Sequence, residues 1–113
     1  MKLQEQKCEP CRGGMPPLSY EEAKVLQQEI REWTLEGNVI ERVFQFKDFK
    51  EAMRFVNRVA EAAEEEGHHP DIHIYYSKVR IELSTHKIKG LSNNDFILAA
   101  KINALAGTGV ISK

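Results

Sequence analysis

Four histidines are candidates for chemistry, and three of them lie within one stretch of ten residues. His68, His69 and His73 fall in GHHPDIHIYY, residues 67–76, and His86 follows in LSTHK. An imidazole can give or take a proton near neutral pH, and it can also bind a transition metal. The stretch is therefore a candidate for metal binding or for acid–base catalysis, unless it is only the polar side of a strand.

The spacing argues against one metal ion bound by the clustered histidines. His69 and His73 have the i, i+4 spacing of helical zinc ligands, but Pro70 between them disfavours a helix. In an extended strand the two side chains lie about 13 Å apart, too far to share an ion. A metal bound by His69, His86 and a carboxylate stays open on spacing alone, as do solvated surface histidines. The third alternative is a metal-free acid–base pair.

Alternating hydrophobicity predicts a β-hairpin around Ser77-Lys78. Residues 71–76 and 79–84 alternate as half-buried strands do. With a two- or four-residue loop centred there, apolar residues pair with apolar residues. The same register places His69 opposite His86 on the polar face, with opposed Cβ atoms about 4.5–5.5 Å apart. It also places His73 opposite Glu82 as a surface pair.

The elements around this hairpin have clear start signals. A capping box at residues 19–22 (SYEE) begins a helix, Asp48 caps a second helix, and Ser92 opens a third. Gly37-Asn38 lies in a hairpin between two short β-prone runs. The order α-β-β-α-β-β-α predicts a two-layer α+β domain, in which a four-stranded antiparallel sheet carries three helices on one face.

An N-terminal segment precedes this domain and holds both cysteines. Cys8 and Cys11 lie in KCEPCRGGMPP, residues 7–17, which is rich in Gly and Pro. Two thiolates supply only half of a structural zinc site, and a thioredoxin-type pair would lie between a strand and a helix. We expect a loosely docked arm over residues 1–18, dispensable for catalysis, and a domain over residues 19–113. Redox sensing and a metal shared between subunits stay open for the two cysteines.

Composition limits the classes of function. With 113 residues the chain is the size of one domain, and 42% hydrophobic residues suit a globular protein. Sixteen basic and 17 acidic residues give a net charge of -1, so we expect no general attraction to nucleic acid or to an anionic membrane. We find no apolar run of about 18 residues and no signal peptide, and expect a cytoplasmic protein.

A set of residues spread along the chain has the spacing of a family signature. The set comprises Glu64, His68, His69, Pro70, Tyr76, His86 and Asp95, together with Trp33 and the FKDF stretch at 46–49. In this set, and over residues 78–86 and 90–102, the chain resembles the pterin-4a-carbinolamine dehydratases. The resemblance covers residues from about 19 to 106. It implies the α+β fold described above, assembled as a homodimer or homotetramer.

The resemblance implies a hydro-lyase that needs no metal and no cofactor. The substrate would be 4a-hydroxytetrahydropterin (4a-hydroxytetrahydrobiopterin), which loses water to give quinonoid dihydropterin in tetrahydrobiopterin recycling. Carried over position by position, the resemblance implies that His68 and His86 supply the proton donor and the proton acceptor, and it leaves the division of roles among the three histidines open. His69 binds and orients the pterin and shares the acid–base role.

The other matched positions are expected to contact or support the substrate. Trp33 would stack on the pterin ring, and Glu64 would orient a histidine. Pro70 fixes the backbone between the histidines and the strand. Asp95 matches a family active-site position, and it is equally the third residue of the last helix, where it would complete a cap.

A binding module is the competing interpretation. Animal members of the family also act as dimerisation cofactors for a homeodomain transcription factor, and a non-catalytic homo-oligomer or hydroxylase helper could carry the same residues. The basic patch needed for direct DNA contact is missing from the sequence. The expected partners are therefore a pterin, further copies of the chain, and phenylalanine hydroxylase, but neither nucleic acid nor a membrane.

Overall fold

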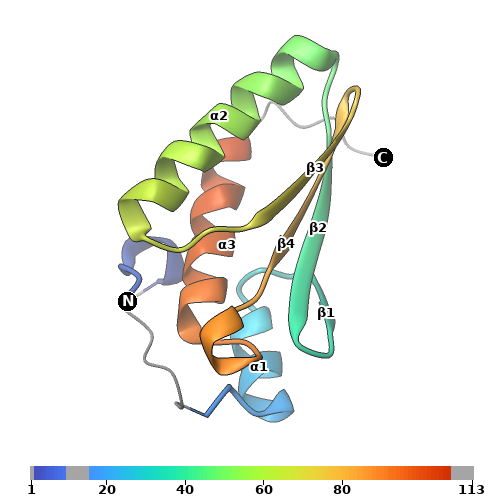
Figure 1. Ribbon diagram of the computed structural model, residues 1–113. Helices are drawn as coiled ribbons and strands as arrows, with labels where there is room; N and C mark the ends of the chain where they lie inside the picture. The colour runs from blue at the N-terminus through green and yellow to red at the C-terminus, as the bar shows by residue number, and fades with distance from the viewer. Residues whose placement is uncertain (1, 10–15, 108–113) are drawn as a thin grey trace.

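The predicted order of elements is confirmed in the computed structural model, which describes residues 2–9 and 16–107 (Figure 1). Two short 3-10 helices, η1 and η2, add to the seven predicted elements. The elements are η1 (Leu3–Glu5), α1 (Tyr20–Gln27), β1 (Thr34–Glu36), β2 (Val39–Gln45), α2 (Phe49–Glu66), β3 (Asp71–Tyr75), β4 (Lys78–Leu83), η2 (His86–Ile88) and α3 (Asn93–Ala106). In the described ranges, no helix combines the length and hydropathy that a membrane span requires.

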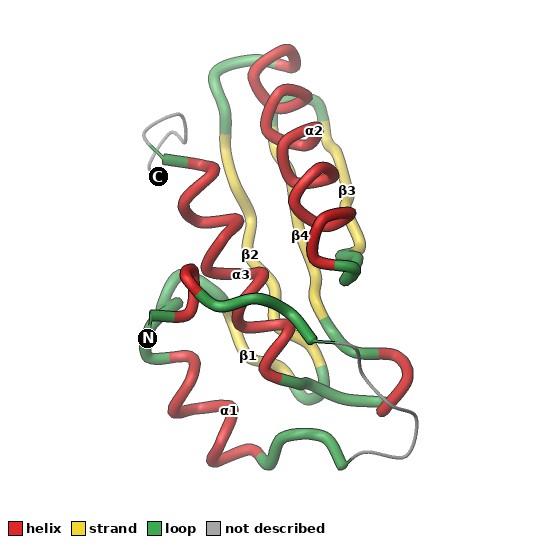
Figure 2. Tube along the Cα trace, turned by 90° about the vertical axis from the view of Figure 1, so that its left-hand side faces the viewer, coloured by secondary structure: helices red, strands yellow, loops and turns green. Residues whose placement is uncertain are grey.

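The four strands form one antiparallel sheet in the order β1-β2-β4-β3. Helices α2 and α3 lie along one face of this sheet, and α1 lies beside β1 at one end of the molecule (Figures 1 and 2). The sheet and the helices therefore form the two layers that the alternation of the sequence predicts.

The core fills the space between these two layers. Strands β2 and β4 turn alternate residues inward, while α2 buries a single stripe. Helix α3 is buried on nearly all sides, because the N-terminal residues pack against the side that the sheet and α2 leave open. The largest fully buried side chains include Trp33, Phe44, Phe96, Ile40, Ile81, Leu83, Leu98 and Ile102.

The predicted caps are confirmed. Ser19 Oγ accepts a hydrogen bond from the Glu22 N–H at 3.1 Å, and Asp48 Oδ1 accepts one from the Glu51 N–H at 2.9 Å. Gly67 ends α2 in the left-handed conformation at φ 66°, as glycine does at many helix ends.

The predicted register of the β3–β4 hairpin is wrong by two residues. The turn lies at Tyr76 and Ser77, with Tyr76 at φ 59°, and Ile72 lies opposite Ile81. A shift by two keeps every side chain on its face of the sheet, so apolar residues still meet apolar partners. Hydrophobicity alone therefore could not distinguish the two registers.

In the observed register, His69 and His86 are not opposite each other, as the predicted register had placed them. His86 lies beyond β4 in η2, so the pairing of His69 with His86 is wrong. His73 lies opposite Arg80 rather than Glu82. Its Nε2 still reaches the diagonal Glu82 Oε1 at 3.2 Å, which makes it a surface cross-strand contact.

The N-terminal residues are docked on the domain, which contradicts the loosely docked arm expected from the sequence. Leu3 is only 3% exposed and belongs to the hydrophobic core. Lys101 Nζ donates to the Gln4 carbonyl at 2.9 Å, and the Leu3 N–H donates to Glu29 at 3.2 Å. Cys11 lies outside the described residues.

Changing Gly67→Ala should lower the free energy of unfolding by about 1–2 kcal/mol, because a Cβ disfavours the left-handed backbone there. No neighbouring atom lies within 4 Å of the added Cβ, so the loss is a backbone effect. Gly67→Asn is the matched control and should lose less, since Asn tolerates this conformation. Urea unfolding measures both, and an Ala variant as stable as wild type would contradict the assignment.

Candidate active site

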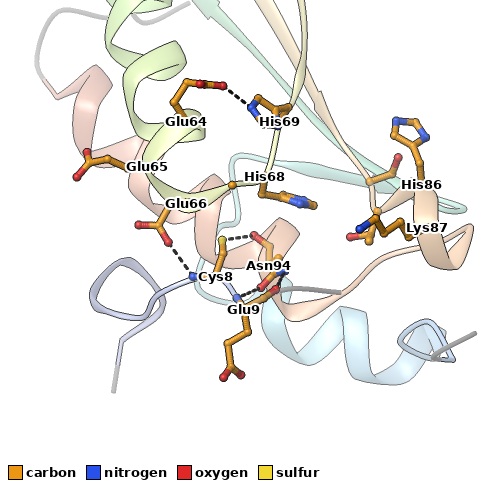
Figure 3. A pocket seen from close by; sticks show the side chains of 13 residues that line it. Cys8, Glu9, Glu64, Glu65, Glu66, His68, His69, His86, Lys87 and Asn94 are labelled. Carbon is orange, nitrogen blue, oxygen red and sulfur yellow. Dashed lines mark hydrogen bonds and ion pairs between the residues drawn. The ribbon is translucent and has the colours of Figure 1, made fainter. Parts of the chain in front are cut away.

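One pocket of about 490 Å³ gathers side chains from segments that are distant in the sequence (Figure 3). This volume is in the range of small-molecule sites. One side comes from the end of α2 and the histidines after it, and the opposite side comes from the end of β4 and the start of η2. The N-terminal residues and the start of α3 close the base. The lining includes Cys8, Glu9, Glu64, Glu66, His68, His69, Ser84, Thr85, His86, Lys87 and Asn94.

His68 is held by a buried carboxylate. Its Nε2 lies 2.6 Å from Asp95 Oδ1; the His68 side chain is 11% exposed and the Asp95 side chain is fully buried. Asp95 Oδ2 accepts two further hydrogen bonds, from the Thr85 hydroxyl at 2.8 Å and from the Ser92 N–H at 2.9 Å. The cap that the sequence predicts for Asp95 is present, and the same carboxylate also positions a histidine.

The hydrogen bonds of Asp95 assign the tautomer of His68. Thr85 and Ser92 both donate to the carboxylate, so a third donated bond from His68 completes its coordination. The proton of a neutral His68 ring is then on Nε2, and Nδ1 is left with a lone pair. Within the part of the chain that the structure describes, no group bonds to Nδ1. Nδ1 of His68 is therefore placed to accept a hydrogen bond or a proton from a ligand, and the imidazolium formed in that way would lie against the Asp95 carboxylate.

His69 has a different environment on the same side of the pocket. Its Nε2 lies 2.6 Å from Glu64 Oε2, and both side chains are exposed. An exposed pair of this kind contributes little to stability, because water screens it. The contact instead favours one orientation of the His69 ring, because Glu64 engages Nε2 and leaves Nδ1 available to a ligand. Glu64 therefore contacts His69 and not His68.

His86 lies on the opposite side of the pocket from His68 (Figure 3). It is exposed at the start of η2, in a loop that the Thr85–Gly90 bridge closes. No described residue bonds to its ring, so both nitrogens can meet a ligand or water. The three candidate histidines thus line one pocket, although the predicted pairing of His69 with His86 in the hairpin is wrong. His73 lies outside the lining.

Trp33 does not reach this pocket. The side chain is fully buried, its Nε1–H donates to Asn103 Oδ1 at 2.8 Å, and its ring packs edge-on against Phe44. The expected stacking of Trp33 on a ligand is therefore wrong, because no part of the indole is accessible. Its role is to fill the core, with its one polar atom satisfied.

Two other expected contact residues lie behind the lining. Asp95 has no exposed surface, so it can act on a ligand only through residues that it holds in the lining, such as His68 and Thr85. Pro70 is not part of the pocket lining and connects His69 to β3. Its fixed φ restrains the segment that carries both histidines.

Thr85 and Asn94 complete the site, and neither was predicted from the sequence. Thr85 is 4% exposed and links the end of β4 to Asp95. Asn94 is 7% exposed and hydrogen-bonds both the N–H and the carbonyl of Glu9. Their positions next to His86 and Asp95 are the only sequence signal that could have marked them.

Cys8 lies in the pocket as a neutral thiol. Burial raises its pKa to about 12, with a further contribution from the negative charge of Glu66. The Cys8 N–H donates to Glu66 Oε1 at 2.7 Å, and its Sγ lies 3.6 Å from the Asn94 carbonyl.

Over residues 2–9 and 16–107, no three His, Cys, Asp or Glu side chains converge as metal ligands would.

Comparison with known proteins places the chain in one family. The family model of pterin 4 alpha carbinolamine dehydratase matches residues 16–105. A relative from Nitrosomonas eutropha, provisionally named a pterin-4-alpha-carbinolamine dehydratase, is 48% identical over 91% of this chain and 92% of its own length. A relative from Aromatoleum aromaticum with the same provisional name is 50% identical over 95% of this chain and 97% of its own.

Solved structures support the same fold. The transcriptional coactivator/pterin dehydratase from Brucella melitensis superposes with a TM-score of 0.77 at 33% identity, over 80% of this chain and 99% of that one. A pterin dehydratase-like protein described as a RuBisCO assembly factor of the alpha-carboxysome gives a TM-score of 0.56 at 25% identity, over 66% of this chain and 87% of that one.

Changing Asp95→Ala should lower the free energy of unfolding by about 2–4 kcal/mol, because it removes a helix cap and leaves buried donors unpaired. Asp71→Ala is the control: Asp71 is exposed on the edge strand β3 and should change stability by less than about 0.5 kcal/mol. Equal effects in urea unfolding would show that the buried carboxylate does not hold these segments together.

Cys8 should alkylate at least about 100-fold more slowly in the folded protein than in the urea-unfolded chain at pH 8.5, because only the thiolate reacts. The raised pKa leaves a very small thiolate fraction at that pH. Peptide mass spectrometry after iodoacetamide treatment separates Cys8 from Cys11. Comparable rates in the folded and unfolded chains would contradict the burial of the thiol.

Proposed function

Since the chain belongs to the pterin-4a-carbinolamine dehydratase family, we propose that it is a hydro-lyase acting on 4a-hydroxytetrahydropterin. The product is quinonoid dihydropterin, formed with the release of one water molecule. The observation that carries the proposal is the pair formed by His68 and buried Asp95 on one side of a pocket, with His86 on the other side.

The reaction requires two proton transfers and no change of oxidation state. The bond between C4a and its hydroxyl oxygen breaks, and that oxygen takes a proton to leave as water. A ring nitrogen loses its proton, and the electrons of that N–H bond form the new double bond to C4a. An acid and a base placed on opposite sides of the ring can assist both transfers.

The environments of the two histidines suggest which is the acid and which is the base. We assign His68 as the base, because the Asp95 carboxylate stabilises the imidazolium that forms when Nδ1 takes a proton. His86 is exposed at the other side of the pocket and is assigned as the acid that protonates the leaving hydroxyl. His69, held by Glu64, binds and orients the pterin.

The proposal includes the setting of the reaction. The protein would act in the cytoplasm as a homodimer or homotetramer, in tetrahydrobiopterin recycling with phenylalanine hydroxylase as the source of the hydroxylated pterin. A second candidate function is a non-catalytic binding module, which is favoured by the descriptions of two structural relatives, one as a transcriptional coactivator/pterin dehydratase and one as a RuBisCO assembly factor. Turnover distinguishes the two.

His68→Ala and His86→Ala should each lower kcat for dehydration by about 10²–10⁴-fold, the usual contribution of a positioned acid or base. His73→Ala is the matched control, since His73 lies outside the pocket on β3, and it should behave like wild type. His69→Ala should raise KM more than it lowers kcat. Stopped-flow absorbance with chemically generated 4a-hydroxytetrahydropterin measures all four variants.

A wild-type protein that does not accelerate dehydration would overturn the enzymatic proposal and favour the binding module. If His73→Ala lowered kcat as much as His86→Ala does, the reaction would have to take place outside this pocket. The His68→Ala/His86→Ala double variant adds a further check. If the two residues act as one unit, the double variant should be barely worse than the poorer single variant.

A further inference from the structure

The N-terminal segment over residues 2–9 is built into the pocket that holds the three histidines. Its backbone is anchored at both ends: Leu3 is buried in the core, and Glu9 is paired with Asn94. The pairing with Asn94 is two-fold, since the Glu9 N–H donates to Asn94 Oδ1 at 2.9 Å and Asn94 Nδ2 donates to the Glu9 carbonyl at 2.6 Å. The side-chain amide thus engages the peptide backbone as a neighbouring strand would.

A second anchor joins this segment to the end of α2. Glu66 Oε1 accepts the Cys8 N–H at 2.7 Å, and Lys101 Nζ lies 3.9 Å from Glu66 Oε2. Glu66 precedes Gly67 and His68 directly, just as Asn94 precedes Asp95. The segment is therefore fixed to the two elements that hold the His68–Asp95 pair, and it lies at the base of the pocket beneath them (Figure 3).

The surface that the segment presents suits a flat heteroaromatic ring. Cys8 is half-buried between Glu66 and Asn94, and its thiol is neutral at physiological pH. The charge of Glu66 is offset by the Cys8 N–H and by Lys101. A neutral sulfur makes favourable contacts with aromatic rings at about 5 Å. Cys8 is thus a neutral, polarisable contact for such a ring among the charged and polar side chains of Glu9, Glu66 and Asn94.

We propose that residues 2–9 form a substrate-binding wall of the active site, with Asn94 as its positioning residue and Cys8 as its contact with the pterin ring. This inference rests on the proposed function for the identity of the ligand. The family model begins only at residue 16, so the family match itself does not include the wall. The relative that covers 95% of this chain aligns into it. The proposal replaces the expectation that this segment is dispensable.

The test compares Asn94→Ala with Asn93→Ala, a neighbouring exposed asparagine outside the pocket lining. Hydrogen–deuterium exchange should show the backbone amide of Glu9 protected in wild type and in Asn93→Ala, and unprotected in Asn94→Ala, where it loses its acceptor. Tetrahydrobiopterin, which lacks the 4a-hydroxyl and cannot be dehydrated, is the binding probe. Asn94→Ala should raise its Kd and the KM for dehydration at least 10-fold, with kcat within about threefold of wild type.

Cys8→Ala is a second variant that keeps all the backbone anchors, and it should raise the Kd for tetrahydrobiopterin about 3-fold without loss of amide protection. Three outcomes overturn the inference: a wild-type segment that exchanges freely, a Kd unchanged when the segment is released, or a loss in kcat alone. A wild-type protein that binds the probe through the wall but does not dehydrate would overturn the proposed function and leave this inference standing.

Discussion

The buried carboxylate of Asp95 is the constraint on which the site depends. It caps α3 through the Ser92 N–H, ties down the end of β4 through Thr85, and holds His68 at the end of α2. A carboxylate with no exposed surface is costly unless donors surround it, and here three segments supply one donor each. Satisfying that carboxylate therefore brings the three segments together at the place where the pocket opens.

The local structure could be predicted from the sequence because its signals are local. Capping residues such as Ser19 and Asp48 act on amides three residues away, and the apolar stripe of α2 has a helical period within a single segment. The register of the β3–β4 hairpin could not be predicted in the same way. A shift by two residues changes the partners but still places apolar residues opposite apolar residues, and only the conformation of Tyr76 at the turn separates the alternatives.

The site was predictable in residue type but not in arrangement. The resemblance identified His68, His69 and His86, and these do line one pocket, whereas Trp33, named with them, is a core residue. The contribution of the N-terminal segment escaped prediction for a physical reason. Its anchors join residues more than 50 positions apart, Cys8 to Glu66 and Glu9 to Asn94. Hydrophobic periodicity and helix caps are local signals and do not predict such contacts. The Gly- and Pro-rich composition suggests a loosely docked arm, although Leu3 and Glu9 are both fixed to the domain.

The central claim is that Asp95 fixes the proton of His68 on Nε2 and leaves Nδ1 free to act as a base. A two-bond ¹⁵N–¹H correlation spectrum of labelled protein, recorded at a pH where the ring is neutral, measures this directly, with His68→Gln to assign the signal. We expect His68 to be protonated on Nε2 in the wild-type protein, and we expect Asp95→Asn to weaken this preference. A neutral His68 protonated on Nδ1 in the wild-type protein would contradict the account.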